Sequence, residues 1–185
     1  MPRSTAGRTI PRGVAGLPAP ANEVSLIMNT FWQSFVKKVA LFEHLSNEQV
    51  GIVADFCEEI LYREGQFVFR ECDASDDLLI VTEGIVAMGH DLGMPGVEDE
   101  ITCMHPGDVF GEMGLFDDLP RSMDARVRTD ARLLRIRKVR WQALIGSDPA
   151  LGLKLLENVA RCISFRLRTT NWELVLVKAA QADRG

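Results

Sequence analysis

The middle of this 185-residue chain consists of short segments with high strand propensity, separated by turn-forming residues. Between residues 58 and 140, β-branched and large apolar residues gather in short runs, and Gly, Asp or Pro stands between them. The clearest runs are 67–69, 78–81, 85–88, 101–103 and 125–127. Many short strands at regular spacing are typical of a sandwich or a jelly roll. We therefore expect a β-roll over residues 58–147.

Helical patterns precede this segment, over residues 25–57. From Ser25, a plausible N-cap, apolar residues recur at spacings of three and four to residue 40. A second helix is expected to begin after Ser46 and to run to about Cys57, because Ser46 and Gln49 form a capping-box pattern.

A heptad pattern follows the strand-rich segment and predicts C-terminal helices over residues 148–179, with a frayed tail over 180–185. The apolar seam consists of Leu153, Leu156, Ala160, Ile163, Leu167, Thr170, Leu174 and Val177. For the first two turns we favour an amphipathic helix packed on the roll. Beyond them we favour a helical pair in a homodimer, because the seam is longer than the expected roll.

Composition narrows the class of protein. The net charge of −5 argues against a general nucleic-acid-binding surface, and no apolar run is long enough to span a membrane. The four cysteines and three histidines are scattered, which favours free thiols in the cytoplasm and no metal site. Residues 1–22 hold four prolines, three glycines, three arginines and no acid, so residues 1–24 are expected to form a disordered basic tail.

Residues 107–122 place a carboxylate, several glycines and a guanidinium close together. Glu112 can accept a hydrogen bond from a ribose hydroxyl, and Arg121 can bind a phosphodiester with two parallel hydrogen bonds, with Ser122 as a further donor. Gly111 and Gly114 carry no Cβ, so the backbone can approach a ligand closely. We expect Gly111 to end a strand and residues 112–116 to form one helical turn whose free N–H groups attract an anion.

Three blocks resemble the cyclic-nucleotide-binding domain family with its catabolite-activator-like β-roll. They are Arg-Glu-Gly-Gln-Phe-Val-Phe-Arg-Glu at 63–71, Asp-Leu-Leu-Ile-Val-Thr-Glu-Gly at 77–84 and Pro-Gly-Asp-Val-Phe-Gly-Glu at 106–112. The resemblance runs from about Leu41 to Leu174. It implies an α+β fold, in which an antiparallel eight-stranded β-roll, or jelly roll, is flanked by N-terminal helices and a long C-terminal helix.

The resemblance also implies a ligand, cyclic AMP in preference to cyclic GMP, and no further cofactor. The implied ligand-binding residues are Gly111, Glu112, Met113, Gly114, Arg121, Ser122 and Asp124. Contacts to the base are expected from the C-terminal helix, at Arg166, Thr169 or Thr170.

Three positions depart from the family pattern. Cys72 stands where glycine is usual, so the turn there must accept a side chain. Gly114 stands where many members have alanine, at little expected cost. Asp124 stands where a small hydroxyl residue is usual, and its carboxylate would oppose phosphate binding by about 2 kcal/mol at an effective dielectric near 20. Either Arg126 neutralises Asp124, or Asp124 accepts a hydrogen bond from a base amino group.

Structural roles compete with the ligand-binding roles. Glu112 could cap the short helix, and Arg121 could pair with Asp117 or Asp118 on the surface. Met113 could lie in the core, and the arginines after Asp124 could form the solvated face of one or two strands.

These patterns indicate a non-enzymatic cyclic-nucleotide sensor, since no nucleophile–base pair is visible. Ligand binding would reposition the C-terminal helix toward a second subunit or a client protein. A stand-alone member without direct DNA binding is expected, because no helix-turn-helix segment follows the long helix. The alternative is a degenerate roll that binds no nucleotide and serves as an assembly module.

Overall fold

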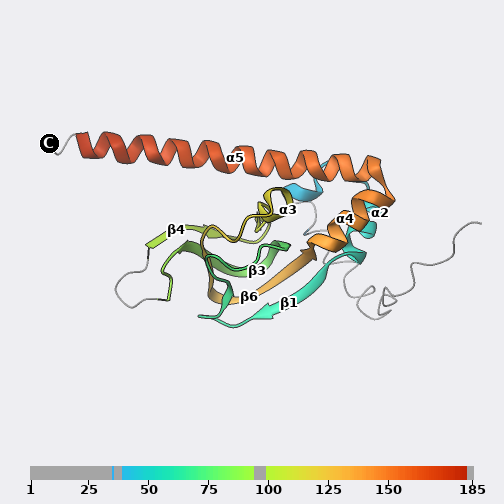
Figure 1. Cartoon of the computed structure of the whole chain (residues 1–185), viewed down its shortest axis with the longest axis horizontal. Helices are drawn as coiled ribbons and strands as arrows, with labels where there is room; N and C mark the ends of the chain where they lie inside the picture. Colours follow the sequence, from blue (N-terminus) through green and yellow to red (C-terminus); the bar gives the residue numbers. More distant parts are fainter. Residues whose placement is uncertain (1–34, 36–38, 94–98, 183–185) are drawn as a thin grey trace, which may run out of the picture.

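The computed structural model describes residues 35, 39–93 and 99–182 (Figure 1). The helix expected from Ser25 lies almost wholly outside these residues, as does the tail 1–24. In chain order the elements are η2 (Ala40–Phe42), α2 (Asn47–Asp55), β1 (Glu58–Tyr62), β2 (Phe67–Phe69), β3 (Asp77–His90), β4 (Asp99–Met104), β5 (Val109–Phe110), α3 (Gly114–Asp117), β6 (Asp124–Arg137), α4 (Lys138–Ser147) and α5 (Pro149–Ala182).

The strands form one antiparallel sheet in the order β1-β6-β3-β4, with β2 paired to β6 and β5 paired to β3. The α+β class and the antiparallel roll are thus confirmed, with helices flanking the sheet and a long helix at the C-terminal end (Figure 1).

The long strands β3 and β6 pair with each other along most of their length, from Asp77↔Arg137 to Gly89↔Asp124. The sequence suggested separate strands at 78–81 and 85–88, but both lie in β3, whose register shifts between Val81 and Val86. Gly84 permits this bend. Its φ is +82°, and a Cβ there would lie 2.4 Å from the backbone oxygen of Asp130. Because β3 and β6 remain unbroken, the described residues form six strands rather than eight.

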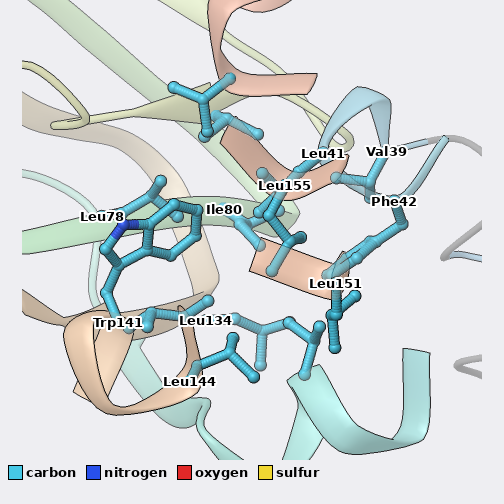
Figure 2. Packing of buried hydrophobic residues seen from close by; sticks show 14 of the residues in the cluster. Val39, Leu41, Phe42, Leu78, Ile80, Leu134, Trp141, Leu144, Leu151 and Leu155 are labelled. Atoms are coloured by element: carbon cyan, nitrogen blue, oxygen red, sulfur yellow. The ribbon is translucent and has the colours of Figure 1, made fainter. Parts of the chain in front are cut away.

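Alternation along β3 divides the buried side chains between two cores. Leu78 and Ile80 contribute to a core under the helices, together with Trp141, Leu151 and other residues (Figure 2). Leu79 and Val81, one position along, contribute to a second core inside the roll. The strand therefore has no solvated face over this stretch, because helices cover one side and the roll closes over the other.

The helices follow local signals in part. Helix α2 begins after Ser46, whose side chain and that of Gln49 form the expected capping box. Residues 138–147, at the end of the segment expected to form the roll, are helix α4. A single helix then runs from Pro149 through Ala182, so residues 180–182, expected to fray, are helical.

Helix α5 changes environment along its length. Leu151, Leu155 and Val159 are fully buried under the roll. Later large side chains are exposed, among them Phe165 at 74% and Trp172 at 70%. The helix extends along the whole molecule, passing α3 (Figure 1). None of the helices among the described residues is both long and apolar enough to cross a membrane.

Candidate functional site

The segment from β5 to β6 forms a tight loop around Arg121. Gly111 follows β5 with φ +74°, a conformation that favours glycine, and a Cβ there would lie 2.6 Å from Nη1 of Arg121. The short helix was expected over 112–116 but spans Gly114–Asp117. The N–H groups of Leu115 and Phe116 already donate to the backbone oxygens of Glu112 and Met113, at 3.0 and 2.9 Å. The expected supply of free helical N–H groups is correspondingly smaller.

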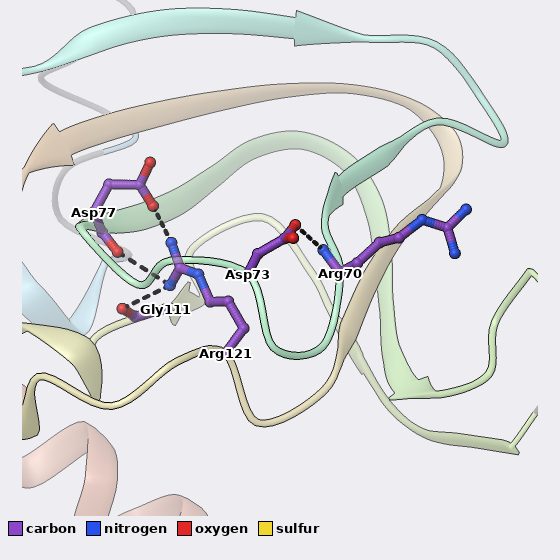
Figure 3. Close-up of polar contacts among 5 residues, drawn as sticks. All are labelled: Arg70, Asp73, Asp77, Gly111 and Arg121. Carbon is purple, nitrogen blue, oxygen red and sulfur yellow. Dashed lines mark hydrogen bonds and ion pairs between the residues drawn. The ribbon is translucent and has the colours of Figure 1, made fainter.

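Arg121 is buried, and only 4% of its side chain is exposed. Its Nη1 donates to the backbone oxygens of Gly111 at 3.0 Å and Asp77 at 3.3 Å, and its Nη2 donates to the Asp77 carboxylate (Figure 3). The guanidinium also lies over the ring of Phe69, 4.1 Å from its centroid. Its Nε is buried and has no hydrogen-bond partner among the described residues. Arg121 therefore retains one unused donor in a dry environment.

The turn at residues 70–73 fixes the backbone of Arg121. The N–H of Arg121 donates to Asp73 O, and the N–H of Cys72 donates to Arg121 O, both at 2.9 Å. Asp73 closes the turn by accepting from the N–H of Arg70 at 2.8 Å (Figure 3). The sequence patterns did not single out Asp73 or Asp77.

Cys72 occupies the left-handed region with φ +67°, and its side chain is exposed. We expect Cys72→Gly to raise the free energy of unfolding by about 0.5–1 kcal/mol, because relief of about 1–2 kcal/mol of strain exceeds the added entropy of the unfolded chain. Denaturant titration measures this change. Cys72→Ser keeps the Cβ and should match the wild type. A glycine variant no more stable than the serine variant would contradict the strain argument.

Glu112 connects the loop to α5. Its side chain is 4% exposed, and Oε1 accepts from Nη1 of Arg166 at 2.7 Å. Nη2 of the same arginine donates to the backbone oxygen of Val109 in β5. Arg166, expected to contact the base, thus connects α5 to the loop. Glu112 and Arg121 are both buried, and each already has an intramolecular partner.

Asp124 has a different environment from the one expected. Its two carboxylate oxygens accept from the N–H groups of Glu71 at 2.8 Å and Leu92 at 3.2 Å. Arg126 donates to the backbone oxygen of Leu92 rather than neutralising Asp124 at a phosphate. Both carboxylate oxygens of Asp124 thus have backbone partners, and the ligand-binding role expected for Asp124 stays a prediction.

The remaining candidates are spread around the loop. Ser122 and Met113 are exposed, which excludes the core position considered for Met113. Gly114 is buried, and a Cβ there would lie 2.3 Å from Ser75 O, so this backbone suits the glycine found here and would have to shift to accept alanine. Thr169 and Thr170 are exposed on α5, where Thr169 donates to Phe165 O at 3.2 Å.

The surface pairing considered for Arg121 does not occur. Asp118 pairs with Lys138, and Asp117 accepts from the N–H of Leu119 at 3.1 Å. The structure therefore brings together Gly111, Glu112, Arg121 and Arg166, while leaving Thr169 and Thr170 farther along α5.

Comparison with known proteins identifies the family. Residues 59–148 match the model of the cyclic nucleotide-binding domain. The cyclic AMP receptor protein of Thermus thermophilus is 30% identical over 147 residues, which cover 80% of this chain and 66% of the relative. A cAMP-dependent protein kinase regulatory subunit of Emericella nidulans is 26% identical over 62% of this chain.

A solved structure supports the same assignment. The catabolite activator protein of Thermus thermophilus aligns with a TM-score of 0.64 at 31% identity, covering 75% of this chain and 63% of that one. The chain spans 66% and 27% of the lengths of the two curated relatives. The family model, the identity and the shared fold agree, and the chain belongs to the cyclic nucleotide-binding domain family.

Proposed function

We propose that the chain is a non-enzymatic regulatory protein that binds a cyclic nucleotide monophosphate, cyclic AMP in preference to cyclic GMP. The observation that carries the proposal is the buried Arg121 with an unused Nε–H group beside the strand end at Gly111. A buried, unpaired donor on a permanent cation favours an anionic acceptor. Two relatives are named for cyclic AMP, which favours that ligand.

In this proposal the ligand's phosphodiester accepts from Nε of Arg121 and from the exposed Ser122. Glu112 accepts from a ribose hydroxyl, while Gly111 lets the backbone lie close to the sugar. Each charge-assisted hydrogen bond contributes about 1.5–3 kcal/mol. Three such contacts together with base burial reach about 8 kcal/mol, which corresponds to micromolar affinity.

Ligand binding would reach α5 through Glu112. The ribose hydroxyl and Arg166 donate to the same carboxylate, so occupancy by the ligand weakens the contact between Glu112 and Arg166. A helix released in this way can reposition, which shifts its availability to a partner. Arg166, Thr169 and Thr170 would then contact the base from the repositioned helix.

Calorimetric titration tests ligand binding. Cyclic AMP should bind saturably with micromolar affinity and cyclic GMP more weakly. The linear nucleotide 5′-AMP serves as a control, since its phosphate lacks the ring that joins it to the ribose. Absence of heat from both cyclic nucleotides at about 100 μM protein would refute ligand binding and leave the alternative of an assembly module. That alternative is favoured by the intramolecular partners of Arg121 and Glu112.

The second half of α5 is proposed to pair two copies of the chain. Leu167 and Leu174 belong to the heptad seam and are 59% and 49% exposed. We expect Leu167→Asp to convert a dimer to a monomer in sedimentation without lowering the stability of the fold. Asn171→Asp adds the same charge off the seam and should leave the dimer intact. A wild-type protein that sediments as a monomer would contradict the pairing.

The thiols support a non-catalytic role. Burial raises the pKa of Cys57 to about 12 and also raises the pKa of Cys162, which lies one turn from Arg166 on α5. Both thiols are neutral at pH 7 and are poor nucleophiles. We further propose that the output is a contact with a client protein, without direct DNA binding. The proposed location is the cytoplasm.

A further inference from the structure

Asp77 begins β3 and already supplies an anion to the arginine that the proposed function assigns to the phosphate. Its carboxylate accepts from Nη2 of Arg121, and 16% of its side chain is exposed (Figure 3). A bound phosphodiester would place a second negative charge at the same guanidinium. Two like charges this close repel each other strongly in a partly buried site. Asp77 therefore competes with the ligand unless another cation receives it.

Arg135 is the cation best placed to receive Asp77. It lies on β6 opposite Leu79, on the strand face that carries Leu133 into the core of the roll. One side of its guanidinium is used, because Nη2 donates to Glu58 at 2.8 Å. Its Nε is buried and has no hydrogen-bond partner among the residues that the structure describes. Like Arg121, it holds an unused donor.

The strand register makes Asp77 and Arg135 diagonal neighbours on one face of the sheet, because Arg135 lies opposite Leu79 and Asp77 is two residues from Leu79. Burial disfavours the charged form of Arg135, but the nearby carboxylates of Glu58 and Asp77 outweigh burial, so the pKa of this arginine is raised. Arg137 is opposite Asp77 in the register, but its Nε faces Glu58 at 3.3 Å and half of its side chain is exposed. The side chain of Arg135 is less exposed than that of Arg137, so its Nε is the more shielded donor.

Resting on the proposed function, we propose that Asp77 is a resident counter-anion of Arg121 that is transferred to Arg135 when the phosphodiester binds. In the free protein Asp77 holds the Arg121 side chain under Gly111 and neutralises it. In the complex the phosphate takes the Nε side of Arg121, and Asp77 shifts toward the unused Nε of Arg135. The division of Asp77 between the two arginines then sets the affinity for the ligand.

A double-mutant cycle on the dissociation constant for cyclic AMP tests the transfer. Asp77→Asn removes the competing charge and should tighten binding about tenfold. The factor is no larger because solvent screens part of the repulsion between the carboxylate and the phosphate. Arg135→Gln leaves Asp77 with Arg121 alone and should weaken binding by a similar factor. The double variant should bind like Asp77→Asn, because Arg135 acts only through Asp77.

Arg132→Gln is the matched control. Arg132 lies on the same strand and pairs with an acid of β1, as Arg135 does, through Nη1 and Glu59 at 2.9 Å. It should leave the dissociation constant unchanged. Unchanged or weaker binding by Asp77→Asn would overturn the proposal, as would an Arg135→Gln effect that persists beside Asp77→Asn. If the wild type binds cyclic AMP but the cycle shows no coupling between Asp77 and Arg135, the transfer is refuted and the proposed function stands. If neither the wild type nor Asp77→Asn binds cyclic AMP, the transfer and the proposed function are both refuted.

A second measurement uses the wild type alone. Side-chain ¹⁵N–¹H spectra resolve the Nε–H group of an arginine when burial shields it from exchange with water. The Arg135 Nε–H signal should shift at saturating cyclic AMP, and this shift should vanish in Asp77→Asn. An Arg135 signal that does not move in the saturated wild type would contradict the transfer, whether or not the Arg135→Gln variant folds.

Discussion

Arg121→Gln should weaken cyclic AMP binding by a factor of 100 or more. The proposed phosphate contact loses its charge and its Nε–H donor, which together contribute about 3 kcal/mol or more. The remaining Asp77 carboxylate would then face the phosphate without a cation between them. Both effects act in the same direction, and calorimetry measures their sum.

Two further variants separate binding from folding. Arg121→Lys keeps the positive charge but not the planar guanidinium with its Nε–H donor, so it should fold normally and bind about tenfold more weakly than the wild type. Arg63→Gln removes an exposed arginine, 83% accessible and paired with Asp130, and should bind as the wild type does. An Arg121→Gln variant with wild-type affinity would remove Arg121 from the site.

Asn158→Leu should lower the free energy of unfolding by about 3 kcal/mol. Asn158 is a buried polar residue of α5, and its Nδ2 donates to the backbone oxygens of Leu41 at 2.9 Å and Glu43 at 2.8 Å. Leucine has a similar volume but leaves both carbonyls without these donors. Each buried polar group left unpaired costs about 1–3 kcal/mol. Urea denaturation followed by tryptophan fluorescence measures the change.

The same contact explains how α5 is held at its buried end. Asn158 ties the η2 turn to the helix, while Arg166, two turns later, ties the helix to the ligand loop. Glu157→Gln changes the exposed neighbour of Asn158 and should leave stability unchanged. A loss below about 1 kcal/mol in Asn158→Leu would mean that water or backbone movement replaces the two bonds.

Much of the fold could be predicted from local patterns. Alternation, glycine punctuation and the Ser46–Gln49 capping box identified the strand-rich centre and helix α2. Residues 138–147 were not identified as helical, because Val139 and Trp141 also fit the alternation of a strand that continues β6. The continuity of β3 through Gly84 depends on close approach to β6, which no local pattern encodes.

The site was predicted in part. Gly111, Glu112 and Arg121 were predicted from residue chemistry at short spacing, and the structure places Arg121 against Gly111 and buries Glu112 and Arg121. Asp77 was missed because its partner lies 44 positions away. The hydrogen-bond partners of Asp124 were not predicted, because strand alternation fixes the face of a side chain but not its hydrogen-bond partners. Those partners come from the turns at Glu71 and Leu92.

The most direct measurement of the central claim is the Arg121 Nε–H signal during titration with cyclic AMP. The signal is assigned by its loss in Arg121→Lys. Because Nε lacks a partner in the free protein, a phosphate oxygen should move its proton resonance strongly downfield and slow its exchange with water. Saturable binding in which this signal shifts with the ligand is the predicted result. Saturable binding with an unmoved Arg121 signal would contradict the claim that this guanidinium holds the phosphate.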